Sequence, residues 1–181
     1  MKDCEEKYGL SYRFVQEKDA EFILRLRTDE KLSRYVHPTP NDIELQREYI
    51  KKYKQKEAEG KEYYFIFFYQ DNPAGVARVY HVEENSFTFG SWLFIQNLPY
   101  WIPIAGAIIA REFAFETLGK SLELEVDGMH EQNKGVISFS KLLGMTINGE
   151  KMEEKGRYLT GELRRDDFIT NKQKVIRTFP K

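Results

Sequence analysis

The chain has 181 residues, enough for one hydrophobic core that removes roughly two thirds of the unfolded surface from water. A single domain over residues 1–181 is therefore expected. Its 28 lysines and arginines nearly balance its 29 aspartates and glutamates. This balance excludes the strong positive charge of a general nucleic-acid binder and favours a small-molecule partner.

The chain has one cysteine and no apolar run of membrane-spanning length. Cys4 is the one cysteine of the chain, which excludes an internal disulfide and a two-cysteine metal or redox site. The sequence does not begin with an apolar leader, and its longest apolar run falls short of the roughly 20 residues that a membrane span needs. We expect a cytoplasmic protein without a bound metal or membrane contact.

The first third of the chain predicts one strand and two helices. Alternating apolar residues over 10–17 predict a strand, and helical spacing over 18–36 predicts the first helix. Residues 39–60 predict a second, amphipathic helix, with Asn41 capping its start and Gly60 ending it.

Three extended runs follow, separated by turn residues: EYYFIFFYQ, VARVYHV and SFTFGSWLFI. They predict an antiparallel meander. The first run is apolar throughout, which is typical of a central strand that is covered on both faces. Helices are therefore expected on both sides of the sheet.

Residues 97–119 begin as a loop and end as a helix. Pro103 is expected at the first helical position, because its fixed φ suits a helix start and its missing N–H is not needed there. The N–H groups that follow would then be free at the positive end of the helix dipole, which favours an anion. A buried helix start without a ligand is the alternative interpretation.

The remaining segments complete the predicted fold. Residues 121–130 predict a fifth strand, residues 133–144 a short helix, and residues 145–168 two further strands. The order β-α-α-β-β-β-α-β-α-β-β predicts a three-layer α/β domain with a mixed, mostly antiparallel sheet and helices on both faces.

An ordered series of passages resembles the GCN5-related N-acetyltransferase (GNAT) family: LRTDEKLSRYV, EYYFIFFYQDNPAGVARVYHV, FTFGSWLF, AFETLG and NKGVISFSKLLGM. Within the family, LRTD, residues 39–42, EGKEYYFIF and SFTFGSW are most similar to the branch that acetylates nucleotide-linked amino-deoxysugars. Such an enzyme would serve polysaccharide biosynthesis. The family also contains N-terminal acetyltransferases of ribosomal proteins.

The resemblance implies the GNAT fold, with acetyl-CoA in a splay between the fourth and fifth strands of the prediction. The implied cofactor contacts are the backbone of Trp92, Leu93 and Phe94, the helix start at Ile102, Pro103, Ile104, Ala105 and Gly106, and the side chain of Asn133. The sequence departs from the family at the helix start, where PYWIPIAG replaces a glycine-rich loop. Side chains make close approach of a phosphate harder there.

The resemblance also assigns the acid–base positions. Ser140 stands where the family has a tyrosine that protonates the leaving thiolate, and Thr88 stands where many relatives carry a glutamate. The acid–base residues left are His37, His81, His130, Glu83 and Asp127. Of these, His130 is the preferred base, with Asp127 to orient it, and direct attack by an amine that loses its proton to water is the alternative.

Four residues are expected at the acceptor: Tyr35 and His37 in the loop that walls the acceptor site, and Tyr100 and Trp101 beside the cofactor. The predicted function is transfer of an acetyl group from acetyl-CoA to the amine of a nucleotide-linked amino-deoxysugar, by a monomer or homodimer. Acetylation of a protein N-terminus and a catalytically silent CoA-binding module are the alternatives.

Overall fold

A computed structural model describes residues 4–180 of the chain. The strands and helices of this part, in chain order, are β1 (Glu5–Lys7), β2 (Leu10–Phe14), α1 (Ala20–Thr28), α2 (Ile43–Ala58), β3 (Tyr63–Tyr69), β4 (Asn72–Tyr80), β5 (Ser86–Phe94), α3 (Trp101–Glu112), β6 (Leu122–His130), α4 (Lys134–Leu142), β7 (Thr146–Glu153), β8 (Gly156–Arg164) and α5 (Arg165–Ile176). A π-helical turn (Phe113–Thr117) extends α3.

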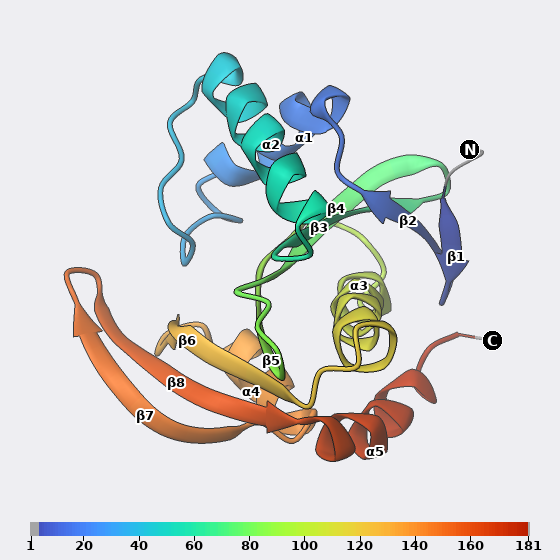
Figure 1. Ribbon diagram of the computed structural model, residues 1–181, viewed down its shortest axis with the longest axis vertical. Helices are drawn as coiled ribbons and strands as arrows, with labels where there is room; N and C mark the ends of the chain where they lie inside the picture. The colour runs from blue at the N-terminus through green and yellow to red at the C-terminus, as the bar shows by residue number, and fades with distance from the viewer. Residues whose placement is uncertain (1–3, 181) are drawn as a thin grey trace.

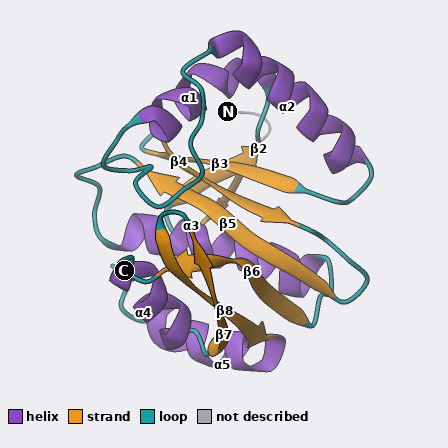
Figure 2. Cartoon of the chain, turned by 90° about the vertical axis from the view of Figure 1, so that its left-hand side faces the viewer, coloured by secondary structure: helices purple, strands orange, loops and turns teal. Residues whose placement is uncertain are grey.

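The strands form one sheet in the order β1-β2-β3-β4-β5-β6-β8-β7. The pair β5–β6 is parallel, and the other neighbouring strands are antiparallel. Helices α1 and α2 lie on one side of the strands, and α3, α4 and α5 lie on the other (Figures 1 and 2). The predicted three-layer α/β fold is confirmed.

The middle strand β3 explains why both faces need a helical layer. Tyr64 and Ile66 are buried in the cluster formed with α1 and α2, while Phe65 and Phe67 are buried in the cluster formed with α3. Since successive side chains of a strand point to opposite faces, an unbroken apolar run requires cover on both. The predicted central strand is confirmed.

The first two helices are shorter than predicted. Helix α1 ends at Thr28, because Asp29 turns into an extended conformation and its carboxylate accepts hydrogen bonds from the N–H groups of Lys31 (2.9 Å) and Leu32 (3.1 Å). Asp42, not Asn41, caps α2 by accepting from the first-turn N–H groups. Residues 29–42 are therefore a long connection that reaches the site described below.

Two elements were missing from the prediction. Strand β1 is a three-residue exposed edge strand, too short for a periodicity to be recognised. Helix α5 is mostly polar, with Phe168, Lys172 and Val175 as its buried residues. No helix in residues 4–180 has the length and hydropathy of a membrane span.

Helix α3 begins at Trp101, two residues before the predicted start at Pro103. The N–H of Ile102 donates to the carbonyl of Pro99 at 3.0 Å, and the N–H groups from Ile104 onward belong to the helical ladder. Gly106 serves packing instead of anion binding: a Cβ there would lie 2.5 Å from the ring of Phe94. The free N–H groups predicted at 104–106 are therefore absent.

Candidate active site

The site begins where β5 and β6 separate. The two parallel strands pair only at Ser86–Leu122 and Phe87–Glu123 and then diverge. A cavity of about 650 Å³ lies in the divergence. Beyond Phe87, the edge of β5 that faces β6 has main-chain groups without a strand partner among the described residues.

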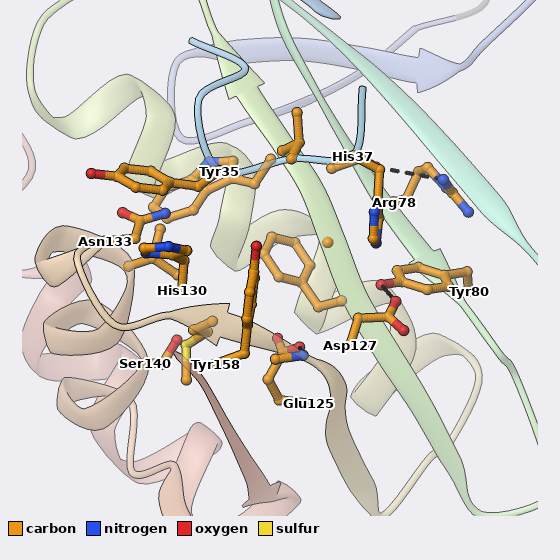
Figure 3. A pocket seen from close by; sticks show the side chains of 18 of the residues that line it. Tyr35, His37, Arg78, Tyr80, Glu125, Asp127, His130, Asn133, Ser140 and Tyr158 are labelled. Carbon is orange, nitrogen blue, oxygen red and sulfur yellow. Dashed lines mark hydrogen bonds between the residues drawn. The ribbon is translucent and has the colours of Figure 1, made fainter. Parts of the chain in front are cut away.

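The cavity has walls from several parts of the fold. The lining comes from residues 35–38 of the long connection, the C-terminal end of β4, the middle of β5, strand β6, the start of α4 and the β7–β8 turn. In Figure 3, Tyr35 and His37 lie on the connection above the cavity, and Glu125 and Tyr158 lie below. The cavity is thus closed by segments far apart in sequence.

A bulge in β5 shapes one wall. Val76 pairs with Leu93 and Arg78 with Gly90, so that Ser91 and Trp92 together oppose a single residue of β4. Ser91 has a φ of +48°, in the left-handed region. Bulges of this kind redirect side chains next to active sites, and here Ser91 and Trp92 line the cavity.

Strand β6 carries three carboxylates at alternating positions, Glu123, Glu125 and Asp127, which places them on one face. Glu123 is fully buried and forms a two-pronged ion pair with Arg111 of α3, with N–O distances of 2.8 and 2.9 Å. The guanidinium of Arg111 also lies 3.7 Å from the centre of the Phe89 ring. This pair fixes β6 against α3 at the closed end of the cavity.

Glu125 lines the cavity one step further along β6. Burial, reinforced by the negative charge of Glu123, raises the pKa of its carboxyl to about 7, although the N–H of Gly128 and the charge of Arg111 oppose the shift. Gly128 has a φ of +84° within a β6 bulge and donates to Glu125 Oε1 at 2.9 Å. A carboxyl with this pKa is suited to proton transfer near neutral pH.

Asp127 does not orient His130 as predicted. Its carboxylate accepts a hydrogen bond from the hydroxyl of Tyr80, on β4 across the cavity (Figure 3). Burial, followed by this bond, raises the pKa of the Tyr80 phenol above its ordinary value. The Tyr80–Asp127 pair links β4 to β6 across the space where β5 and β6 separate.

His130 is buried, and both ring nitrogens are bonded to main chain. Nε2 lies 3.0 Å from the carbonyl oxygen of Lys155, and Nδ1 accepts from the N–H of Gln132 at 3.1 Å. A carbonyl can only accept, so Nε2 is the donor in the first bond, and Nδ1 is the acceptor in the second. His130 fastens β6 to the β7–β8 turn, and the geometry does not favour it as the base.

Five other residues named as candidates from the sequence line the same cavity: Tyr35, His37, His81, Asn133 and Ser140. The Tyr35 ring lies 5.1 Å from that of His130. Tyr158 of β8 also lines the cavity. The sequence pattern predicted neither Tyr158 nor Glu125 as a site residue.

Tyr100 and Trp101 line a different part of the molecule. The Tyr100 hydroxyl donates to the carbonyl of Thr178 at 2.7 Å, and the Trp101 ring packs on Tyr69 and Phe179 at 6.0 and 5.9 Å. Neither residue lines the cavity. Tyr100 is 65% exposed, and both side chains contact the C-terminal segment. Their contact with the acceptor stays a prediction.

The chain matches the family model of an acetyltransferase (GNAT) domain over residues 10–146. It belongs to the GNAT family. The predicted family is confirmed, and this GNAT is an acetyl-CoA-dependent N-acetyltransferase. A search of curated proteins found no match.

Solved structures with a similar fold include several kinds of acetyltransferase. Apo FdhC, a nucleotide-linked sugar GNAT, is 30% identical with a TM-score of 0.79, over 98% of this chain and 97% of FdhC. Ribosomal-protein-S5-alanine acetyltransferase from Vibrio fischeri is 12% identical, with a TM-score of 0.77 over 91% and 98%. RimL, a ribosomal L7/L12 alpha-N-protein acetyltransferase in complex with coenzyme A, is 15% identical, with a TM-score of 0.71 over 89% and 97%. The last two similarities concern the fold.

The residues of this GNAT fit acetyl-CoA along β5. The β5 edge beyond Phe87 offers unpaired main-chain groups to a pantetheine arm, and Asn133 and Trp92 line the space beside it. Leu93 and Phe94 can contribute only main chain, since their side chains are buried. At the α3 start, Trp92 donates from Nε1 to the carbonyl of Pro103 at 2.9 Å. The N–H groups left for a pyrophosphate are those of Tyr100 and Trp101, not those of residues 102–106.

Proposed function

We propose that this GNAT acetylates the amino group of a nucleotide-linked amino sugar. The observation that carries the proposal is the 30% identity to FdhC over nearly the whole of both chains. The ribosomal-protein acetyltransferases and the spermidine N-acetyltransferases among the solved structures are 12–15% identical. An acceptor of the FdhC kind is therefore favoured over a protein N-terminus or a polyamine.

The cavity supports a small, polar acceptor. Its volume of about 650 Å³ lies in the range of small-molecule sites. Carboxylates from β6 lie on one side, and Arg27 and Arg78 lie on the side of the long connection. A molecule with an amine at one end and an anionic group at the other would meet complementary charge at both ends.

Glu125 is the base in this proposal. Bound acetyl-CoA supplies the acetyl group as an activated thioester. The amine of the sugar must lose a proton as its C–N bond forms, and Glu125 accepts that proton. Its pKa of about 7 means that a large share is ionised at neutral pH, and the Gly128 N–H holds the carboxylate in place.

Proton return to the thiolate can come from two hydroxyl groups. Ser140 is buried and lines the cavity, and Tyr158 lines it from β8. A phenol ionises near pH 10, whereas an aliphatic hydroxyl is a much weaker acid. Tyr158 is therefore the better donor and takes the role that the resemblance assigns to position 140.

The test is turnover of a panel of amino sugars linked to dTDP and UDP with acetyl-CoA, measured by thiol release and by mass of the product. The proposal expects one nucleotide-linked sugar to be acetylated at its amine. Polyamines and ribosomal-protein N-terminal peptides serve as competing acceptors. Peptide acetylation without sugar turnover, or CoA binding without any turnover, would contradict the proposal.

A further inference from the structure

A smaller cavity of about 250 Å³ adjoins the main one between the long connection and α2. The two cavities share Arg27, Pro38 and Arg78 in their walls. Arg27 comes from the end of α1 and Arg78 from β4. The two guanidinium groups thus stand where one cavity passes into the other.

Charge at this passage is not balanced. Arg27 donates to neutral acceptors: Thr39 Oγ1 at 2.6 Å, the carbonyl of His37 at 3.3 Å and Ser91 Oγ at 3.5 Å. Within the described part of the chain it has no carboxylate in ion-pair distance. A partly buried guanidinium without a counter-charge is costly, and an anionic ligand would remove that cost.

Arg78 adds to the excess of positive charge where the two cavities meet. Its Nε lies 3.0 Å from Glu62 Oε1, but Lys56 shares the same carboxylate at 3.2 Å. Arg27 and Arg78 each make a long, 3.5 Å contact with the Ser91 hydroxyl. Two cations therefore share the Glu62 carboxylate, and Arg27 beside them has no carboxylate partner among the described residues. Phosphate oxygens would offer both arginines shorter, charge-assisted bonds in place of the shared hydroxyl.

The smaller cavity has the features of a base site. Gln46 is 5% exposed, and its Nε2 has no hydrogen-bond partner among the described residues. An unpaired buried donor is unfavourable unless a ligand supplies an acceptor. Tyr49 and Leu45, on the same side of α2, are 37% and 50% exposed. They offer a ring and an apolar side chain against which a flat base can stack.

We infer that Arg27 and Arg78 bind the diphosphate of the acceptor nucleotide, and that its base occupies the smaller cavity and accepts a hydrogen bond from Gln46. The sugar then extends into the main cavity towards Glu125. This inference rests on the proposed function and names the subsite for the nucleotide. CoA also carries a nucleoside diphosphate, but the α3 start, where its pyrophosphate is expected, lines neither cavity.

Calorimetric titration with dTDP and UDP, without a sugar, tests the inference. Arg27→Gln should weaken diphosphate binding about tenfold or more, the usual share of a charge-assisted bond, and Arg27→Lys should restore it in part. Arg25→Gln is the matched control, because Arg25 is exposed on the same helix. Gln46→Leu should weaken both nucleotides several-fold while inorganic pyrophosphate binds unchanged.

Binding of CoA provides the second part of the test. Saturating dTDP or UDP should leave CoA affinity unchanged, and Arg27→Gln should leave it unchanged too. Competition between CoA and the nucleotides would assign the subsite to CoA and overturn the inference. Sugar turnover with equal KM in the wild type and Arg27→Gln would overturn the inference while the proposed function stands. Absence of both sugar turnover and nucleotide binding would overturn both.

Discussion

Replacing Glu125 with glutamine should lower activity and raise stability at the same time. Glutamine has nearly the same shape and keeps an acceptor for the Gly128 N–H, but it cannot take a proton from an amine. Loss of a general base should lower kcat by about 10²- to 10⁴-fold. The wild-type kcat should rise with pH through about 7, where Glu125 ionises, and the variant should lack this limb.

The stability gain follows from the raised pKa. Below the ordinary glutamate value of 4.5, both folded and unfolded chains hold the proton, so the two proteins should be equally stable. As pH rises from 4.5 to about 7, Glu125 ionises in the unfolded wild-type chain before it ionises in the folded one. The free energy of unfolding of the wild type therefore falls over this range. A difference of roughly 2.5 pKa units corresponds to about 3 kcal/mol. The glutamine variant escapes this loss.

Urea unfolding at pH 4.5 and pH 8, with steady-state kinetics across the same range, makes both measurements. Glu84→Gln is the control, because Glu84 is exposed in the turn between β4 and β5. A gain in stability with near-normal kcat would show that Glu125 is a buried carboxyl without a catalytic role. Loss of activity without a gain at pH 8 would refute the explanation of its pKa.

Three further substitutions test the other assignments. His130→Asn should lower the melting temperature by several degrees, because the contacts with Lys155 and Gln132 are lost. At a temperature where both proteins are folded, its kcat should stay within about tenfold of the wild-type value. A loss of about 10²-fold or more in a folded variant would show that His130 is the base. Tyr158→Phe should lower kcat several-fold and leave CoA affinity unchanged, whereas Ser140→Ala should change kcat little. The reverse ranking in the same assay would identify Ser140 as the proton donor to the thiolate. Trp101→Ala should destabilise the fold by about 2 kcal/mol or more in urea unfolding, through lost packing on the C-terminal segment, and leave acceptor KM unchanged; a raised KM would return this residue to the site.

The sequence predicted the sheet and the family but not the face that carries the chemistry. Apolar alternation at Leu122 and Leu124 indicated strand β6, yet its buried position between them is Glu123. The cause is Arg111, distant in the sequence, which pairs with that carboxylate from α3. Periodicity identifies a strand from local residues, whereas a buried charge depends on a partner that only the fold brings close.

The start of α3 was misplaced for a local reason. Proline is favoured at the first helical position but is tolerated throughout the first turn, where no N–H is needed. Pro103 therefore allowed a start two residues earlier. Family resemblance did predict the cavity residues Tyr35, His37, Asn133 and Ser140. It could not place Tyr100 or Trp101, because their partners, the Thr178 carbonyl and the Phe179 ring, lie in a segment with no recognisable pattern.

The strand order imposes a sequence of events on the making of this site. Strand β8 lies between β6 and β7, although both precede it in the chain (Figure 1). During synthesis, β6 and β7 cannot pair with each other natively and must wait for residues 156–164. Chains fold as they emerge from the ribosome, N-terminal parts first. The meander of β3, β4 and β5 can therefore assemble while β6 still lacks its partner β8. The wall that holds Glu125 and Tyr158 is then the last part of the sheet to close, and a ribosome-bound chain arrested before β8 should have a folded first half and no acetyltransferase activity.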